Sequence, residues 1–285
     1  MPEGDTIFRT ARNLGRALLG KPVTGFRSTF PLLTRFNDDT PLVGQTVDRV
    51  EARGKWLLIH FSGGGILTSH LLMSGRWHIY RQGERWQAAR IHMRIVIENG
   101  DYQVVGFRVP VVRMHTEQSL ARDPHIARSE NDLLSEEFDA EAALARLLGR
   151  PHEALADALL DQTLLAGIGN VFKSEICFVN GLSPFRPVAT LTRDEVAMTI
   201  ASAQRLLRAN VLEDSGDTIV TYRGQQRRTT HASDPGASLW VYGRAGEPCR
   251  RCGERIRRRI RGDDARVTFW CPQCQPMPDG SEIDG

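Results

Sequence analysis

The chain of 285 residues contains few lysines, few cysteines and no long apolar run. Without a stretch of about 18 apolar residues, a membrane-spanning helix is excluded. The first residues lack a basic segment followed by an apolar one, so no secretory signal is expected. Only Lys21, Lys55 and Lys173 carry an ammonium group among 37 basic residues, so each is a candidate for a role that arginine cannot fill. The five cysteines include two CxxC pairs, which indicates metal binding in a reducing cytosol rather than disulfides.

Positive charge is concentrated near the end of the chain. The whole sequence carries a formal charge of +3, with 41% hydrophobic and 25% charged residues, as in an ordinary globular protein. Between Arg223 and Arg266, however, twelve arginines stand against five acids, a net of about +7. A local field of this size favours a polyanionic partner, most simply a nucleic acid. A solvated, salt-bridged surface is the alternative.

The order of sequence patterns predicts an α+β protein of several domains. An amphipathic helix is expected over Asp5–Leu19, followed by short β-branched and aromatic runs from residue 47 to 114 that predict an antiparallel sandwich or flattened barrel. A polar segment near 122–134 then separates this domain from a helical one. The predicted domains are 1–125 (β-sandwich with a leading helix), 126–235 (helical), 236–275 (cysteine-bearing hairpin) and 276–285 (disordered tail).

Within the helical part, helices are expected over 138–149, 151–161 and 170–181, the second beginning at Pro151. Thr192 and Glu195 form a capping-box pattern ahead of a longer helix. A loop rich in Gly, Arg and Thr is expected from about 214 to 238.

The four paired cysteines predict a structural zinc site. The sequence reads CRRC, eighteen residues, then CPQC, which is the spacing of a four-thiolate site with both pairs on turns at the base of a hairpin. Four thiolates leave no open position for water, so the Zn²⁺ ion, one per chain, folds a segment too short to build its own core. Cys177 is expected to be an inert buried side chain. The predicted metal ligands are Cys249, Cys252, Cys271 and Cys274.

A glycine-rich turn predicts a site for an anion. In the segment LLDQTLLAGIGNVFKSE, Gly167 and Gly169 allow a ligand to approach the backbone, and a new helix begins at Asn170. The free amides of that helix start and the Asn170 side chain can bind a phosphate. A plain helical hairpin with an asparagine cap remains the alternative.

Five segments in order resemble the formamidopyrimidine-DNA glycosylase/endonuclease VIII family, and most closely its endonuclease VIII branch. They are MPEG, RGK at 53–55, DQTLLAGIGNVFKSE at 161–175, VYGRAGEPCRRCG and RVTFWCPQC. The resemblance implies a β-sandwich domain, a helix–two-turn–helix domain and a C-terminal zinc finger. It also implies a bifunctional DNA glycosylase and AP (apurinic or apyrimidinic site) lyase of base-excision repair, bound to damaged double-stranded DNA.

The resemblance assigns the catalytic roles. If Met1 is removed, Pro2 exposes a secondary amine, and an α-amino group titrates at ~7.7–8.0, far below a lysine. This nitrogen attacks the sugar C1′, Glu3 moves protons as general acid and base, and β,δ-elimination cuts the strand. Lys55 contacts a phosphate and assists elimination; a solvated strand-end lysine is the alternative.

The family also implies the residues that hold DNA. Asn170 and Arg266 match its phosphate-binding residues, and Lys173 is a further candidate. Met73, in HLLMSGRW, stands where the family presents a side chain that fills the gap left by the extruded base, although a core methionine is the alternative. Phe107 and Arg108 are candidates for the other gap-filling side chains.

The sequence departs from the family at one position and leaves substrate choice open. The acid usually found three positions after Glu3 is replaced by Thr6, with Asp5 beside it. The MPEG start and the segment GKWLLIHFS resemble the endonuclease VIII branch, which implies oxidised pyrimidines as substrates. The segment SHLLMSG and the long 214–238 loop instead resemble the 8-oxoguanine branch. The rival functions are the same chemistry on 8-oxoguanine and formamidopyrimidine, a non-catalytic zinc-ribbon DNA-binding protein, and an RNA-binding zinc module. We expect a monomer in a bacterial-type cytoplasm, associated with the nucleoid and with no membrane partner.

Overall fold

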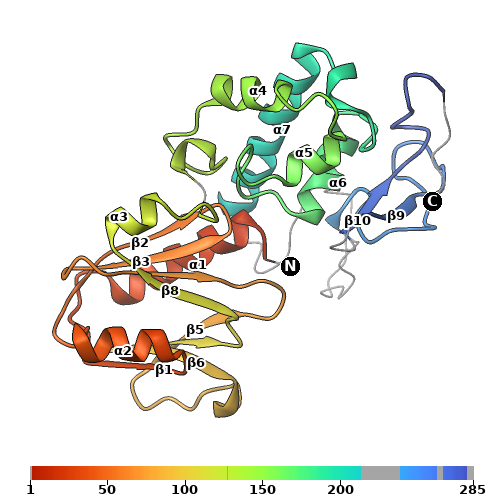
Figure 1. Cartoon of the computed structure of the whole chain (residues 1–285). Coiled ribbons are helices and arrows are strands. Elements are labelled where there is room, and N and C mark those ends of the chain that lie inside the picture. Colours follow the sequence, from red (N-terminus) through yellow and green to blue (C-terminus); the bar gives the residue numbers. More distant parts are fainter. Residues whose placement is uncertain (1, 127, 213–237, 262–265, 281–285) are drawn as a thin grey trace. The chain divides into compact units, whose positions relative to one another are not determined.

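The computed structural model describes all residues except 1, 127, 213–237, 262–265 and 281–285 (Figure 1). The chain divides into two compact units, Met1–Arg128 and Ser129–Gly285, each with its own hydrophobic core. The loop expected near 214–238 lies almost entirely outside the described residues, as does the last half of the expected tail. Among the helices that are described, none combines the length and the apolar character needed to cross a bilayer.

The first unit is a sandwich of two four-stranded antiparallel sheets, with strand orders β1-β6-β7-β5 and β2-β3-β4-β8. This confirms the predicted β-sandwich with a leading helix. The elements of the unit are α1 (Gly4–Leu18), β1 (Gly25–Ser28), α2 (Pro31–Asp39), β2 (Val47–Arg53), β3 (Trp56–Phe61), β4 (Ile66–His70), β5 (Arg76–Arg81), the 3₁₀ turn η1 (Arg90–His92), β6 (Met93–Glu98), β7 (Tyr102–Phe107), β8 (Val111–His115) and α3 (Glu117–Ala121).

Helix α1 is part of the sandwich core. Its apolar stripe of Ile7, Leu14 and Leu18 is almost fully buried and packs with residues from both sheets. Burying one such side chain contributes roughly 1.5–3 kcal/mol. The first residues of the chain are therefore attached to a rigid support, which matters because Pro2 and Glu3 precede this helix directly.

Strand β3 is buried along its whole length, which explains why its sequence WLLIHF is apolar except for His60. Leu57 and Ile59 face the core shared by the two sheets. Trp56 and Leu58 face a second, smaller cluster that contains Leu120 of α3. A strand covered on both faces has no reason to alternate between apolar and polar residues.

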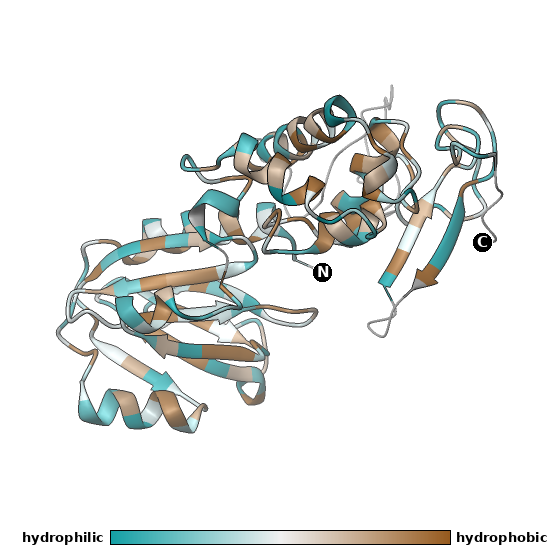
Figure 2. Cartoon of the chain, turned by 45° about the horizontal axis from the view of Figure 1, so that its top comes forward, coloured by the Kyte–Doolittle hydropathy of each residue, from teal (hydrophilic) through white to brown (hydrophobic). Residues whose placement is uncertain are grey.

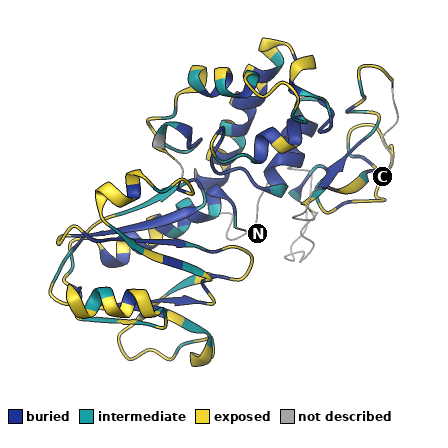
Figure 3. Cartoon of the chain, viewed as in Figure 1, coloured by how far each residue is buried: buried dark blue, intermediate teal, exposed yellow. Residues whose placement is uncertain are grey.

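Helix α2 and strand β1 are among the elements of this unit that were not predicted from the sequence. Helix α2 buries only Leu33, while Leu32 is 83% exposed, so its hydrophobic pattern is weak (Figure 3). Strand β1 has four residues and pairs with β6 at the edge of its sheet. Short edge elements carry too little periodicity to be recognised locally.

The second unit contains helices followed by a β-hairpin. Its elements are the 3₁₀ turn η2 (Ser129–Asn131), α4 (Ala140–Leu148), α5 (Leu155–Leu160), α6 (Asn170–Val179), the 3₁₀ turn η3 (Val188–Thr190), α7 (Arg193–Leu212), β9 (Arg257–Arg261) and β10 (Arg266–Trp270). The predicted capping box is confirmed: the Glu195 amide donates to Thr192 Oγ1 at 3.1 Å, and the Thr192 amide donates to Glu195 Oε2 at 2.8 Å. Helix α7 follows it directly.

The prediction of a helix beginning at Pro151 is wrong. Helix α5 begins at Leu155, because the backbone before it bonds to the segment 186–189 instead. The Leu155 amide donates to the Arg186 carbonyl at 2.9 Å, and the Val188 amide donates to the Glu153 carbonyl at 2.9 Å. A tertiary strand-like pairing thus replaces the first helical turn.

Candidate functional site

The beginning of the chain is fixed by helix α1. Glu3 is the N-cap residue of the helix, with an extended backbone (φ −111°, ψ −176°), and its carbonyl accepts the Ile7 amide at 3.1 Å. Its side chain is fully buried, whereas Pro2 is half-buried. The carboxyl group predicted to move protons is therefore shielded from solvent, and the proline before it is more accessible.

The first turn of α1 contains an acidic residue, Asp5, although the acid expected from the family at position 6 is replaced by Thr6. Asp5 is fully buried, and Arg9 Nη2 donates to its Oδ2 atom at 3.2 Å. Burial raises the pKa of Asp5, and the nearby Arg9 charge opposes this shift. Thr6 Oγ1 also donates to Asp5, at 3.4 Å. The first turn of α1 therefore contains a buried carboxyl group at position 5, paired with Arg9, while position 6 carries a hydroxyl group.

Lys55 and His70 lie at the same end of two neighbouring strands of one sheet. Lys55 stands in the turn between β2 and β3, and the next residue, Trp56, pairs directly with His70 at the end of β4. Burial, and then the Lys55 charge, lower the pKa of His70 to about 4. The ring is therefore neutral at pH 7, and since Nδ1 accepts the Leu72 amide at 3.1 Å, its hydrogen lies on Nε2.

Sequence reasoning did not single out His70. A lone histidine in a strand has no local signal for function. Only the register of β3 and β4, which joins residues fourteen positions apart, places it beside the predicted catalytic lysine. We regard His70 as a further candidate site residue.

Met73 lies on an exposed loop rather than in the core. Its side chain is 73% exposed, in the connection between β4 and β5. The loop packs on the turn before β8, where Ser74 Oγ donates to the Arg108 carbonyl at 3.4 Å. Leu72 (φ 45°) and Arg108 (φ 49°) are the non-glycine residues with positive φ in the described chain. Strained backbone of this kind gathers at functional sites, since the surroundings must hold it.

The structure corrects the prediction for Phe107. This side chain is 3% exposed and packs edge-on against the rings of His78, Tyr80 and Trp86. It therefore cannot fill a gap in DNA. Arg108 is exposed, and its Nη2 atom lies 2.6 Å from His92 Nε2.

In the second unit, a single glutamine holds the glycine-rich turn. Gln162 donates to the carbonyls of Leu160 at 2.8 Å and Ile168 at 3.1 Å, and it accepts the Gly167 amide at 3.1 Å. Gly167 has φ 103°, a conformation that L side chains rarely adopt. Helix α6 then begins at Asn170, as the sequence predicted.

Lys173 does not point to solvent, which corrects its prediction as a phosphate contact. Its side chain is 1% exposed. The ammonium group donates to Asn170 Oδ1 at 3.3 Å, to the Val267 carbonyl at 3.1 Å and to Thr268 Oγ1 at 2.9 Å. Three protein acceptors match the three donors of an ammonium group, so Lys173 joins α6 to β10.

Arg266 is the first residue of β10 and is exposed. It pairs with Arg261 across the hairpin, and β9 is hydrophilic over most of its length (Figure 2). The hairpin thus carries guanidinium groups on a rigid two-stranded support. Such groups match phosphate oxygens in shape and charge.

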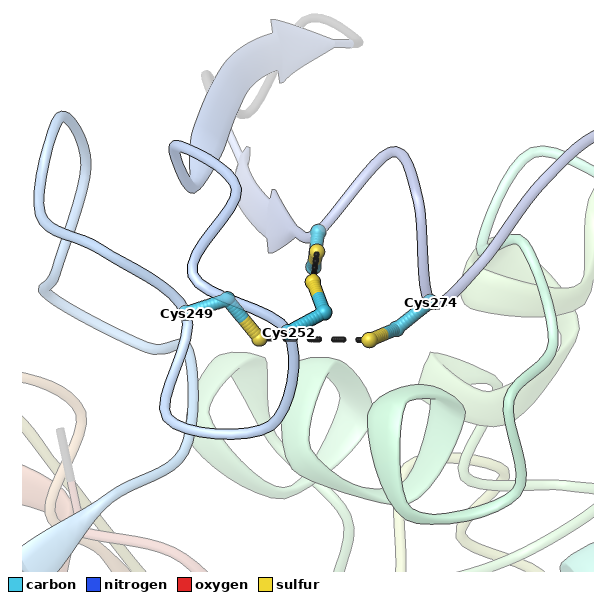
Figure 4. Close-up of side chains that lie close together, drawn as sticks. Cys249, Cys252 and Cys274 are labelled. Carbon is cyan, nitrogen blue, oxygen red and sulfur yellow. Dashed lines mark hydrogen bonds between the residues drawn. The ribbon is translucent and has the colours of Figure 1, made fainter.

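The four predicted metal ligands come together. Their Sγ atoms all lie within 4.8 Å of one another, with 3.9 Å between Cys249 and Cys274 and 3.5 Å between Cys252 and Cys271 (Figure 4). Tetrahedral Zn–S bonds of about 2.3 Å place the sulfurs about 3.8 Å apart. Burial, and then the neighbouring sulfurs, raise the pKa of Cys271 to about 11. The cluster therefore favours a divalent cation that offsets the charge of four thiolates.

The chain was compared with known proteins. Its residues 1–110 match the family model of the formamidopyrimidine-DNA glycosylase N-terminal domain, and residues 129–222 match the formamidopyrimidine-DNA glycosylase H2TH domain. It is 42% identical to a probable endonuclease 8 2 of Streptomyces coelicolor, over 98% of this chain and 95% of the relative. It is 38% identical to the DNA-(apurinic or apyrimidinic site) lyase Nei2 of Mycolicibacterium smegmatis, over 96% and 99% of the two chains.

Solved structures share the fold. The formamidopyrimidine-DNA glycosylase of Lactococcus lactis, solved with DNA that contains an AP site, aligns with a TM-score of 0.77 at 23% identity. The alignment covers 96% of this chain and all of that one. MutM in complex with DNA that contains carbocyclic 8-oxo-G also aligns with a TM-score of 0.77, over 97% of this chain and all of that one, at 21% identity.

Fold, cysteine cluster and relatives together define a DNA-repair enzyme of the bifunctional type, a DNA glycosylase that is also an AP lyase. The chain belongs to the formamidopyrimidine-DNA glycosylase/endonuclease VIII family. The predicted α+β fold with a sandwich, a helix–two-turn–helix domain and a terminal cysteine cluster is thereby confirmed.

Proposed function

We propose that this enzyme removes oxidised bases, pyrimidines first, from double-stranded DNA through a covalent intermediate on Pro2. The observation that carries the proposal is the start of α1, where a fully buried Glu3 follows a half-buried Pro2. Removal of Met1 frees the Pro2 nitrogen, of which about half or more is unprotonated near pH 8, because an α-amino group titrates at ~7.7–8.0. The curated relatives named endonuclease 8 support the preference for pyrimidines.

The chemistry follows from these groups. The Pro2 nitrogen forms a bond to C1′ as the bond between C1′ and the base breaks, and Glu3 supplies a proton to the departing base or sugar. The C1′–O4′ bond then breaks as Glu3 gives a proton to O4′, which opens the sugar ring and leaves an iminium between the Pro2 nitrogen and C1′. The iminium acidifies the C2′ proton, whose removal expels the 3′ phosphate. A second elimination expels the 5′ phosphate. Lys55, together with neutral His70, contacts a phosphate beside the lesion and assists elimination.

Other residues hold the DNA. Asn170 and Arg266 bind phosphates from the second unit, and exposed Met73 fills the gap left by the extruded base. One Zn²⁺ ion, held by the four clustered cysteines, would supply the folding free energy of the hairpin. We place the domain limits at 1–125, 126–235, 236–275 and 276–285.

The chain acts as a monomer on damaged double-stranded DNA. The curated bacterial relatives support a cytoplasmic enzyme. Its proposed substrate, damaged DNA, puts its place of action at the nucleoid. No membrane partner is part of the proposal.

Borohydride trapping tests the covalent step. Reduction of the iminium should give a stable protein–DNA adduct with a thymine glycol duplex, and Edman sequencing or mass spectrometry should place it on residue 2. A matched protein with a Gly inserted before Pro2, so that the proline nitrogen is an amide, should give no adduct there. Glu3→Gln should lose base excision yet keep part of its trapping with a preformed AP site. If the zinc-loaded, correctly trimmed protein forms no adduct with any lesion, the enzyme acts by another nucleophile or only binds DNA.

A second substrate class is supported by the loop sequence SHLLMSG, which resembles the branch that acts on 8-oxoguanine. The same trapping experiment with 8-oxoguanine and formamidopyrimidine duplexes separates the two. We expect single-turnover excision of thymine glycol to be at least about tenfold faster, because the net contribution of one hydrogen bond in the base pocket is on the order of 1.4 kcal/mol. The opposite order would assign the enzyme to the other substrate class.

A further inference from the structure

Helix α6 carries three consecutive buried polar residues, Lys173, Ser174 and Glu175, all at most 1% exposed. Figure 3 shows α6 buried along most of its length. Polar groups are normally this well buried only when they are hydrogen-bonded. Each of the three has at least one partner on the segment that carries the cysteines, about 65 to 95 residues further along the chain.

Each of the three residues holds a different part of that segment. Glu175 accepts hydrogen bonds from the successive backbone amides of residues 240 to 242, at 2.8 to 2.9 Å. Ser174 Oγ accepts the Phe269 amide of β10 at 3.3 Å. Lys173 bonds to Val267 and Thr268 of the same strand, directly after Arg266. Lys173 differs from the other two because it also contacts a side chain proposed to bind DNA.

That contact determines how the Asn170 amide is turned. An ammonium group can only donate, so the Asn170 atom that faces it at 3.3 Å must be the carbonyl oxygen Oδ1. The NH₂ group of the amide is then at the opposite end. Asn170 is partly exposed, and no residue in the described part of the chain accepts a hydrogen bond from its Nδ2 atom. A phosphate oxygen, which only accepts, is the complementary ligand for this NH₂ group.

We propose that Lys173 is a positioning residue that turns the Asn170 amide toward a DNA phosphate. The inference rests on the proposed role of Asn170 as a phosphate ligand. Without the lysine, the amide is free to rotate and to present its carbonyl oxygen to the phosphate, which is repulsive. Helix α6 stays joined to β10 through Ser174 and the Phe269 amide, so the Arg266 end of the hairpin is kept in place.

A double-mutant cycle on the full, zinc-loaded chain tests the proposal. The probe is a duplex with a tetrahydrofuran abasic-site analogue, whose binding is measured by fluorescence anisotropy and requires no chemistry. We expect Lys173→Met and Asn170→Ala each to weaken binding about tenfold, the size of one charge-assisted hydrogen bond. The double variant should bind about as weakly as Asn170→Ala alone, because Lys173 acts through Asn170.

Ser174→Ala is the matched control. It removes the neighbouring buried link from α6 to β10 but does not touch the Asn170 side chain. Its effect on binding should stay within about twofold and should add to that of Asn170→Ala. If Ser174→Ala weakened binding and were coupled to Asn170→Ala as strongly as Lys173→Met, any damage to the contact between α6 and β10 would have the same effect. The specific role of Lys173 would then be wrong.

Asn170→Asp gives a test that leaves Lys173 in place. An aspartate at 170 should accept a stronger, charge-assisted bond from Lys173 and raise the melting temperature. Its second oxygen would face the phosphate, so binding should fall further than in Asn170→Ala. A lower melting temperature, or wild-type binding, would overturn the inference even if Lys173→Met fails to fold.

The outcomes separate the two proposals. If Asn170→Ala itself leaves binding unchanged, the phosphate role of Asn170 is wrong. If Asn170→Ala weakens binding but folded Lys173→Met does not, or if the two losses add fully, only the role of Lys173 is wrong. Borohydride trapping tests the covalent step on Pro2, and its result does not depend on the roles of Asn170 and Lys173.

Discussion

At the scale of single residues, His70 shows how burial sets the state of a site group. Burial and the Lys55 charge lower its pKa to about 4, so the folded protein keeps the ring neutral where an ordinary histidine would be charged. A neutral ring beside Lys55 offers a hydrogen bond without adding repulsion. The arrangement therefore suits a site where the lysine charge is reserved for a phosphate.

This shift predicts a pH dependence of stability. Since the folded-state pKa lies below the ordinary value of 6.5, the unfolded chain binds more protons between about pH 6.5 and pH 4. The contribution of His70 to the free energy of unfolding is present above pH 6.5 and is lost as the pH falls toward 4. After allowance for solvent screening, we expect on the order of 1–2 kcal/mol.

Urea denaturation at pH 6.5 and pH 4.5 measures this loss. His70→Gln should reduce the difference between the two pH values, whereas His125→Gln, at an exposed position, should leave it unchanged. An equal pH dependence in wild type and His70→Gln would show that other groups cause the effect.

Met73 predicts a change in function without a change in stability. Because its side chain is 73% exposed, Met73→Ala should leave the melting temperature within about 2 °C of wild type. Excision of a base from duplex DNA should slow about tenfold, since the gap left by the flipped base is no longer filled. The rate of strand cleavage at a preformed AP site should fall less than the rate of base excision.

Single-turnover kinetics on the two substrates check this difference. Met198→Ala is the control, because Met198 is also exposed (57%) but lies on α7. Equal slowing of both reactions by Met73→Ala would point to a role in DNA binding rather than in filling the gap.

At the scale of elements, helix α6 is the attachment point of the cysteine-bearing segment. Glu175 is fully buried and accepts three backbone amides of that segment. Glu175→Gln removes the charge and turns one acceptor into a donor. We expect a loss of about 3 kcal/mol in the free energy of unfolding, the range for hydrogen bonds to a charged group.

Urea denaturation of the zinc-loaded protein measures this effect. Glu117→Gln is the control, because that side chain is 72% exposed and should cost no more than about 0.5 kcal/mol. A loss as small as the control's would mean that the buried carboxylate is not needed to hold the segment.

At the scale of the whole molecule, the positive hairpin predicts how salt affects DNA binding. Arg266 is exposed at the start of β10, so Arg266→Ala should weaken binding to lesion-containing and intact duplexes alike. The slope of log K against log salt concentration should become shallower by about 0.9, the value for one phosphate contact. Arg205→Ala, an exposed arginine on α7, should not change the slope. A change confined to the choice of lesion would assign Arg266 to base recognition.

Metal removal should affect the two units differently. A strong chelator should remove one zinc per chain, disorder the cysteine-bearing hairpin and abolish DNA binding, because the metal holds its four ligands together. The first unit has its own core and should keep a cooperative melting transition. Metal analysis measures the loss of zinc, the fluorescence of Trp240 and Trp270 reports the disorder of the hairpin, and fluorescence anisotropy measures the loss of DNA binding. Undiminished binding by zinc-free protein would contradict a structural metal.

Local patterns predicted much of this molecule. The apolar spacing of α1, the capping box of Thr192 and Glu195 and the glycine-rich turn before α6 each depend on residues within a few positions of one another. The two CxxC pairs were predictable in the same way, because the spacing and type of their residues define a four-thiolate site. In these cases the interacting residues are close together in the sequence, so the local sequence is enough to predict the structure.

By itself, the sequence determined the fold class, the four clustered cysteines and the family. Only the tertiary structure placed His70 beside Lys55, buried Phe107 and Lys173, and moved the start of α5 to Leu155. Each of these depends on pairing with a segment 14 to about 95 residues away. Burial and hydrogen-bond partners are properties of such pairings, and they decide whether a polar side chain meets DNA or holds the protein together.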